Sequence, residues 1–109
     1  HPSEVSAVMV ESHESLSNFN DICSFINQTL SEIEQLRPNQ FPLSQSTLWR
    51  GSEICGISFC LHGPRAVRLS AVWEAERNTI LFYGSGGERV QRTHLVSAPP
   101  IEQCVASAA

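Results

Sequence analysis

The feature that most restricts the fold of this sequence is the stretch 54–96, where short apolar segments alternate with turn residues. The segments run from about Ile54 to His62, Arg65 to Trp73, Thr79 to Tyr83 and Arg89 to Val96, after a short first one from Thr47 to Arg50. Each has the length and the two-residue alternation of a β-strand. Because the connections are short, segments that follow one another in sequence should lie side by side in an antiparallel meander.

An amphipathic helix is predicted before these strands, between Leu16 and Leu36. Apolar residues recur there at steps of three and four, namely Leu16, Phe19, Ile22, Cys23, Ile26, Leu30 and Ile33. Ser15 or Ser17 is expected to cap the start of the helix, and Pro38 is expected to close its end. A helix of about 20 residues is roughly 30 Å long, which is enough to cover four or five strands.

These patterns together predict an α+β fold, with a long N-terminal helix packed on a four- to five-stranded antiparallel β-meander. The residues expected to face the helix are Cys55, Ile57, Phe59, Leu61, Val67, Leu69, Ala71 and Trp73. Those expected on the opposite face are Ile54, Gly56, Ser58, Cys60, His62, Ala66, Arg68, Ser70 and Val72. With 109 residues the chain is expected to form one domain over 15–96, with a flexible arm over 1–14 and a poorly ordered tail over 97–109. Val8, Met9 and Val10 leave an edge strand open as an alternative within the arm.

The charges are unevenly distributed along the chain, whose net charge is −4. Residues 1–36 hold six acids and no base, whereas the remainder holds seven arginines and five acids, and there is no lysine. The missing lysines disfavour a nucleic-acid partner, because lysine is a common phosphate-binding residue. No apolar run reaches the ~20 residues of a membrane-spanning helix, so the composition predicts a soluble protein without a membrane partner.

The four cysteines, Cys23, Cys55, Cys60 and Cys104, follow no disulfide or metal-binding pattern. Three of them lie within apolar periodicity, where a free cysteine behaves as a small hydrophobic residue. The start of the chain, HPSEVSAVMVES, lacks the basic region and apolar core of a secretory signal. Reduced thiols in a cytoplasmic protein are therefore expected.

A family resemblance rests on the run Phe59 to Arg65, on Arg77 to Tyr83 and on Gly87 to Arg89. With these motifs the chain resembles a group of small bacterial proteins with an LHGPR…RNTILFY core and no assigned activity. The resemblance covers about residues 17–96. It implies a stand-alone bacterial domain and carries over no catalytic residues.

The sharpest local motif is Cys60-Leu61-His62, which places a thiol and an imidazole on the same face of a strand. A histidine can activate a cysteine by taking its proton, so the pair is a candidate for a thiol enzyme centred on Cys60. However, side chains two apart on a strand are roughly 6.5–7 Å apart at the backbone, and no aspartate is placed to orient His62. A half-buried cysteine beside a turn histidine is the commoner origin of such a pair, so enzymatic function is disfavoured.

Metal binding is a second reading of the same region. Cys55, Cys60 and His62 have a spacing unlike that of zinc knuckles, and His94 would complete a site only if its strand lay beside theirs. No metal site is therefore predicted.

An anion pocket is a third reading. Arg65 and Arg68 flank one turn, Arg89 and Arg92 lie on the last strand, and the loop 84–87 exposes backbone amides. Such a combination can hold a phosphate or carboxylate, although many arginines of this kind are solvated edge charges.

The face of the sheet opposite the helix carries a mixed, small and moderately apolar set of side chains. Such a face packs on a second copy of the chain, lines a ligand cavity or contacts a larger partner. The preferred prediction is a non-enzymatic binding or regulatory module that forms a homodimer through its sheet. The alternative is a domain that binds a small anion or a haem-type tetrapyrrole, with an undetermined cofactor. The candidate ligand-binding residues are Cys60, His62, Arg65, Arg68, Arg92 and His94.

Overall fold

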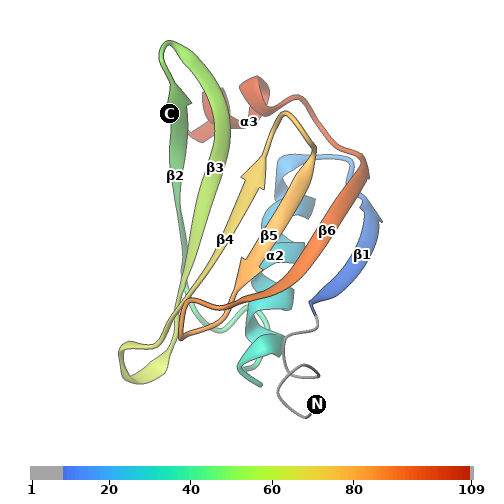
Figure 1. Cartoon of the computed structure of the whole chain (residues 1–109). Coiled ribbons are helices and arrows are strands. Elements are labelled where there is room, and N and C mark those ends of the chain that lie inside the picture. The colour runs from blue at the N-terminus through green and yellow to red at the C-terminus, as the bar shows by residue number, and fades with distance from the viewer. Residues whose placement is uncertain (1–8, 109) are drawn as a thin grey trace.

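The computed structural model describes the backbone of residues 9–108 and the side chains of residues 9–105. Its elements follow the order β1 (Val10–Ser15), α2 (Phe19–Ile33), β2 (Leu43–Arg50), β3 (Glu53–His62), η1 (Pro64–Ala66), β4 (Arg68–Glu74), β5 (Thr79–Tyr83), β6 (Arg89–Ser97) and α3 (Ile101–Ala108). The six strands form one sheet in the order β1-β6-β5-β4-β3-β2 (Figure 1). Strands β2 to β6 form an antiparallel meander, which confirms the α+β class, and β1 pairs with β6 in parallel.

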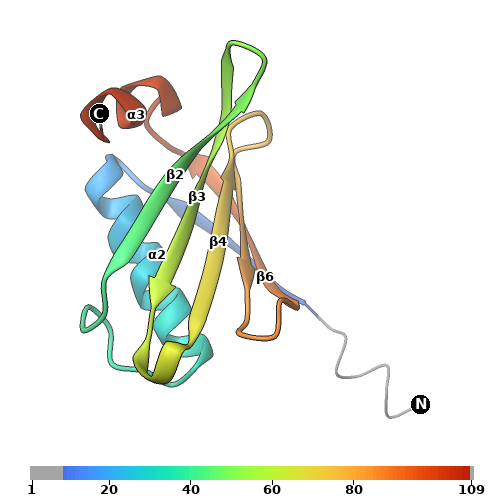
Figure 2. The ribbon, with the colours of Figure 1, turned by 90° about the vertical axis from the view of Figure 1, so that its left-hand side faces the viewer.

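Helix α2 lies on one face of the sheet, as the apolar stripe predicts (Figure 2). Ile22, Ile26 and Leu30 have no exposed surface and belong to the same core cluster as Phe59, Leu69 and the other inward residues of β3 to β5. Aromatic contacts add to this packing, because Phe19 lies 6.2 Å from Phe59 and Phe25 lies 5.9 Å from Phe82 between ring centroids.

Both ends of α2 differ from the prediction, and each has an identifiable cause. At the start, Asn18 Oδ1 accepts a hydrogen bond from the backbone N–H of Asp21 at 2.8 Å, so Asn18 is the N-cap and neither Ser15 nor Ser17 is. At the end, Gln35 adopts φ 57°, and the backbone N–H of Leu36 donates to Ser31 O at 2.7 Å. This left-handed turn ends the helix before Pro38 and leaves 15 residues, about 22 Å of helix.

Two segments outside the predicted helix and meander belong to the fold. Residues 10–14 of the predicted flexible arm form β1 together with Ser15. Of the alternative edge strand, Val10 belongs to β1, Met9 does not, and Val8 lies with residues 1–8 outside the described part. Residues 101–108, assigned to the poorly ordered tail, form α3, and its Ile101 and Cys104 are buried in the core cluster. The polar sequence of β1 gives no periodic signal for a strand, because its pairing with β6 depends on backbone groups. The hydrogen bond from Leu16 N–H to Ser97 O at 3.0 Å continues this pairing.

The strands differ from the prediction in the start of β2, in the start of β4 and in a bulge within β3. Strand β2 begins at Leu43 rather than Thr47. Strand β4 begins at Arg68, because Pro64–Ala66 form a short 3-10 turn in which Arg65 and Ala66 have positive φ. A bulge in β3 pairs Trp49 with Ile54 and skips Cys55, so that Ile54 packs against the core and Cys55 leaves the predicted inward row.

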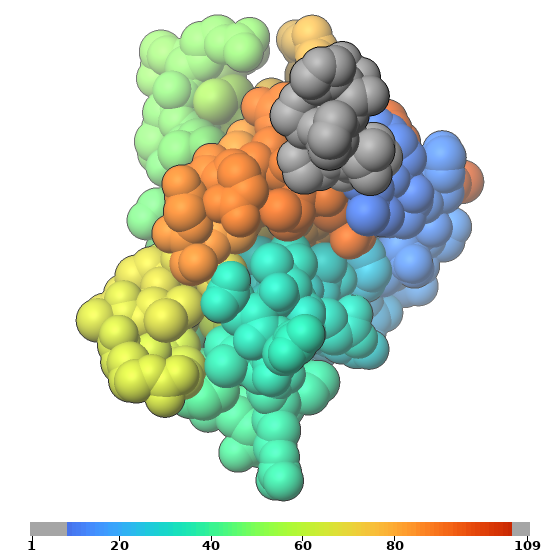
Figure 3. Space-filling model, turned by 60° about the horizontal axis from the view of Figure 1, so that its bottom comes forward, coloured from blue at the N-terminus to red at the C-terminus, as the bar shows by residue number. Residues whose placement is uncertain are grey.

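The lower end of the molecule joins the two layers. There the β3–β4 turn, the β5–β6 loop and the end of α2 lie together (Figure 3). Ser85 Oγ in the β5–β6 loop donates to Glu34 Oε2 at the end of α2 at 3.2 Å. Within the described residues, no helix is long and apolar enough to cross a membrane.

The docking of α3 is tested by Ile101→Ala. Ile101 is 6% exposed and packs with the core cluster, so the variant should lower the free energy of unfolding by about 3 kcal/mol. Urea denaturation followed by circular dichroism measures this, with the exposed neighbour variant Glu102→Ala as the control. Equal stability of the two variants would contradict the packing of α3.

Two thiols make stability depend on alkaline pH. Burial raises the pKa of Cys23 and of Cys104 above the ordinary 9.0, with added repulsion from Cys104 for the first and from Glu102 for the second. Because the unfolded chain loses these protons first, their stabilisation is present below about pH 9 and is lost as pH rises through the folded pKa values. As pH is raised beyond about 9, the urea concentration at the midpoint of unfolding should therefore decrease. The decrease should be less steep in the double variant Cys23→Ala, Cys104→Ala. Identical slopes for the two proteins would contradict the assignment.

Candidate functional site

The sheet face opposite α2 and α3 is uncovered within the described residues (Figure 2), and we call it the outer face. Alternation along the strands places on it Glu11, His13, Ser44, Ser46, Leu48, Ser58, Cys60, His62, Arg68, Ser70, Val72, Thr79, Leu81, Tyr83, Arg92 and His94. Small and polar residues predominate, and Leu81 is the only one of these that is both large and apolar and less than one-tenth exposed. Five of the six candidate ligand residues lie on this face, and Arg65 lies in the adjoining turn.

One end of the outer face holds Cys60 and His62 on β3. Ser44, on the neighbouring strand β2, places its Oγ 2.8 Å from His62 Nε2. The sulfur of Cys60 has, among the described residues, a single hydrogen-bond contact, the carbonyl of Leu61 at 4.0 Å. The histidine therefore interacts with a serine rather than with the thiol, and the sequence-based pairing of Cys60 with His62 as base does not appear in this arrangement.

The two arginines predicted near this end, Arg65 and Arg68, lie in different environments. Arg65 lies exposed in the 3-10 turn with φ 54°. Arg68 pairs in register with His62, and its Nη1 donates to the backbone carbonyl of Val67 at 3.1 Å. The glycine loop 84–87 already faces an anion of the protein itself, since a Cβ on Gly84 or Gly86 would collide with the carboxylate of Glu88. Two amides of the loop are also already bonded within it, because Gly84 N–H donates to the backbone carbonyl of Glu88 at 2.9 Å and Gly87 N–H donates to that of Gly84 at 3.0 Å, and are not available to an anion.

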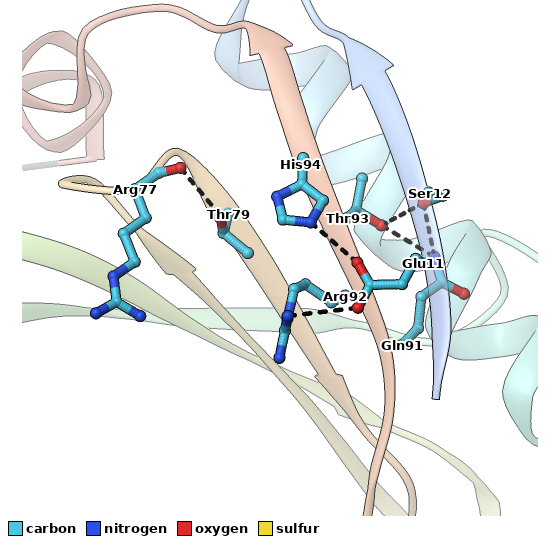
Figure 4. A network of polar contacts seen from close by, with 8 residues as sticks. All are labelled: Glu11, Ser12, Arg77, Thr79, Gln91, Arg92, Thr93 and His94. Atoms are coloured by element: carbon cyan, nitrogen blue, oxygen red, sulfur yellow. Dashed lines mark hydrogen bonds and ion pairs between the residues drawn. The ribbon is translucent and has the colours of Figure 1, made fainter. Parts of the chain in front are cut away.

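At the other end, β1 and β6 form a charged cluster (Figure 4). The carboxylate of Glu11 on β1 lies 3.4 Å from Arg92 Nη1 and 2.9 Å from His94 Nε2. The parallel register places Glu11 beside Arg92 and His13 beside His94, and the two imidazole rings stack with centroids 5.1 Å apart. Glu11 thus holds the two candidate residues of β6 in place.

A depression of about 240 Å³ lies on the outer face beside this cluster, and we call it the arginine depression. It is lined by Glu74, Arg77, Thr79, Leu81, Arg89, Arg92 and His94. Arg77 comes from the β4–β5 turn and forms no ion pair with the described residues, whereas the guanidinium of Arg89 lies 5.6 Å from the Tyr83 ring centroid and donates to its hydroxyl at 3.2 Å. Three permanent cations therefore surround one hollow that contains a single carboxylate, Glu74.

The six predicted residues do not converge on one site. Cys60 and His62 lie on β3, and Arg92 and His94 lie on β6, three strands away and roughly 14 Å across the sheet. Register pairs His94 with Thr79 and His13, so it cannot complete a metal site with Cys60 and His62. Within residues 9–105, no group of three or more His, Cys, Asp or Glu side chains is arranged to hold a metal ion.

Sequence reasoning missed Arg77, Thr79 and Glu11 as neighbours of Arg92. Arg77 lies in a turn and Glu11 in a segment assigned to a flexible arm, so neither belonged to a predicted strand face. The predicted meander could have placed Arg77 near Arg92, because Arg77 directly precedes β5, and β5 pairs with β6, the strand of Arg92.

Two further hollows adjoin the hairpin of β2 and β3. One of about 240 Å³ continues the outer face from the arginine depression, and Gly56 and Val72 form part of its floor. The other, of about 510 Å³, is open to solvent between the hairpin, Ala75 and α3, and Glu53, Glu76 and Glu102 line it. Arg50 is the one arginine in its lining, so acids outnumber bases there, and it shares none of the arginines of β6.

Gly56 shapes the floor of the first of these hollows. A Cβ there would lie 2.5 Å from the carbonyl oxygen of Trp73, which is backbone of the paired strand and cannot rotate away. We expect Gly56→Ala to lower the free energy of unfolding by ~3 kcal/mol through this overlap. Urea titration measures the effect, and Ser58→Ala on the same strand and face is the matched control. A Gly56→Ala protein as stable as the control would contradict the close approach of β3 and β4.

The chain matches no protein-family model, no curated protein and no solved structure.

Proposed function

We propose that this protein is a non-enzymatic binding module that recognises a small anionic ligand, bearing a carboxylate or phosphate group, in the arginine depression. The observation that carries the proposal is the convergence of Arg77, Arg89 and Arg92 on one hollow of the uncovered sheet face. Set against the carboxylates of Glu74 in the lining and Glu11 beside Arg92, the three guanidinium groups leave the hollow with a net positive charge, in a chain whose net charge is −4. Positive potential in a hollow attracts anions from solution.

The chemistry of the lining supports an oxyanion rather than an apolar ligand. Guanidinium groups donate paired hydrogen bonds that match the two oxygens of a carboxylate or phosphate. Thr79 and His94 also line the hollow, but Thr79 Oγ1 donates to the Arg77 carbonyl at 3.0 Å and His94 Nε2 lies 2.9 Å from Glu11 Oε1 (Figure 4). The guanidinium groups are therefore the donors that an anion would meet. The volume of about 240 Å³ is below that of sites for drug-sized molecules, which favours a small ligand.

The ion pairs of the site are adaptable. Arg92 and Glu11 have side chains 37% and 48% exposed, so their pairing is a solvent-screened contact that an incoming anion can replace. Arg77 is exposed and unpaired within the described residues, and thus needs no such exchange. Binding should accordingly weaken with added salt.

The proposal is tested by titrating the protein with inorganic phosphate and with citrate, against chloride at equal ionic strength. Arg92→Gln and Arg77→Gln should each weaken binding by roughly ten- to a hundredfold, since a hydrogen bond to a charged group contributes roughly 1.5–3 kcal/mol and ~1.4 kcal/mol corresponds to tenfold. Isothermal titration calorimetry measures affinity, and NMR of the arginine Nε–Hε groups identifies which side chains respond. The matched control is Arg37→Gln, an exposed arginine after α2.

Two outcomes would contradict the proposal. One is the absence of both heat and chemical-shift change with either anion. The other is equal weakening by Arg37→Gln and Arg92→Gln, which would indicate unspecific attraction to arginine. The other functions predicted from sequence, a haem-type site and a thiol enzyme, gain less support, because His62 pairs with Ser44 and lies three strands from His94.

A further inference from the structure

The two edges of the sheet differ in how they are protected against pairing with another strand. Edge strand β1 is six residues long and carries Glu11, His13 and Glu14. Edge strand β2 is eight residues long and has no charged residue between Leu43 and Trp49. Natural sheets commonly block an edge with charges, prolines or bulges. In β2 these lie only at the ends, as Pro42, the bulge opposite Trp49 and Arg50, so the stretch from Leu43 to Leu48 is unprotected, whereas β1 carries charges along its length.

The backbone of β2 presents a regular row of groups away from the sheet. The carbonyl of Pro42 accepts the N–H of His62 at 3.0 Å, and hydrogen-bonded pairs alternate along an antiparallel ladder. The backbone groups of Ser44 and Ser46 therefore point toward β3, in register with Cys60 and Ser58. Those of Gln45 and Thr47 point outward, at the end of the sheet.

The side chains of β2 include an exposed aromatic. Trp49 is 58% exposed, which is unusual for the largest side chain of a small protein. Leu43, at the opposite end of the strand, is half-buried against the core. Both lie at odd positions of the strand, so they project from the same face of the sheet.

We propose that β2 pairs antiparallel with β2 of a second copy of this chain, about a two-fold axis at Ser46. This register joins the outward groups of Gln45 to those of Thr47 of the partner subunit, and it sets Trp49 opposite Leu43 of the partner subunit. A two-fold interface must be complementary to itself, and an uncharged strand with one large apolar residue near each end meets that condition. The product is a continuous sheet of twelve strands, twice the six of one chain.

A second copy fits this edge better than a charged peptide does. The strand offers no charge to select a partner of opposite sign, and self-pairing brings no like charges together between Leu43 and Trp49. We expect a contact limited to one eight-residue strand and its Trp49 to bury less than the ~800 Å² per partner of a stable complex. The dimer should therefore be reversible and dependent on concentration.

The test is sedimentation equilibrium of the protein over a range of concentrations. The wild type should change from 12.0 kDa toward twice that mass as concentration rises. Gln45→Pro removes an outward N–H without touching the ladder to β3, so it should raise the dissociation constant by about tenfold or more. Gln45→Ala keeps the N–H and should dimerise as the wild type does.

A second control separates this edge from the other. Val10→Lys alters an apolar residue on β1 that is 56% exposed, and should leave the dimer unchanged, whereas Trp49→Lys should weaken it. Amide hydrogen exchange supplies an independent readout, since Gln45 and Thr47 should become protected only at high concentration. Circular dichroism confirms that each variant is folded.

Three results would overturn the inference. The first is a wild type that stays monomeric at every concentration. The second is a dimer that survives Gln45→Pro or is lost in Val10→Lys. The third is a monomer in which the β2 amides become protected only when an extended peptide is added, which would assign the edge to a different occupant. None of these measurements depends on anion binding, so they stand apart from the test of the arginine depression.

Discussion

The packing of α2 against one face of the sheet is the interaction on which the rest of the structure depends. Ile22, Ile26 and Leu30 are fully buried against the inward residues of the central strands. Because α3 adds Ile101 and Cys104 to the same core cluster, both helices cover one side. The opposite side is left to small and polar residues, and the hollows with arginine linings lie there.

The second constraint is the pairing of the two ends of the fold. Strand β1 runs parallel to β6, although they are separated by the whole meander. Parallel pairing needs a long crossover, and α2 with strands β2 to β5 supplies it. This arrangement brings Glu11 to Arg92 and His94, and so creates a charged cluster from residues more than 80 positions apart.

The parts of the fold that could be predicted from sequence are those set by local periodicity. The stripe of α2 and the alternation in β3, β4 and β5 placed Ile57, Phe59 and Trp73 inward, and these residues are buried. The bulge that removes Cys55 from that row, the left-handed Gln35 and the pairing of β1 depend on tertiary hydrogen bonds that have no periodic signature. Arg92 and His94 lie in a strand that periodicity predicts, so they could be identified as candidates. Their neighbours Arg77, in a turn, and Glu11, in β1, could not be identified in this way.

The position of Glu11 has a consequence for how such a face responds to its surroundings. A carboxylate attached to the first strand already occupies the neighbourhood of Arg92, and a tethered group acts at an effective concentration on the order of millimolar. Any dissolved anion that binds Arg92 has to displace the carboxylate of Glu11. Competition from Glu11 thereby sets a minimum concentration or affinity for binding at Arg92. Only ligands that are abundant, or that contact several guanidinium groups at once, would reach it.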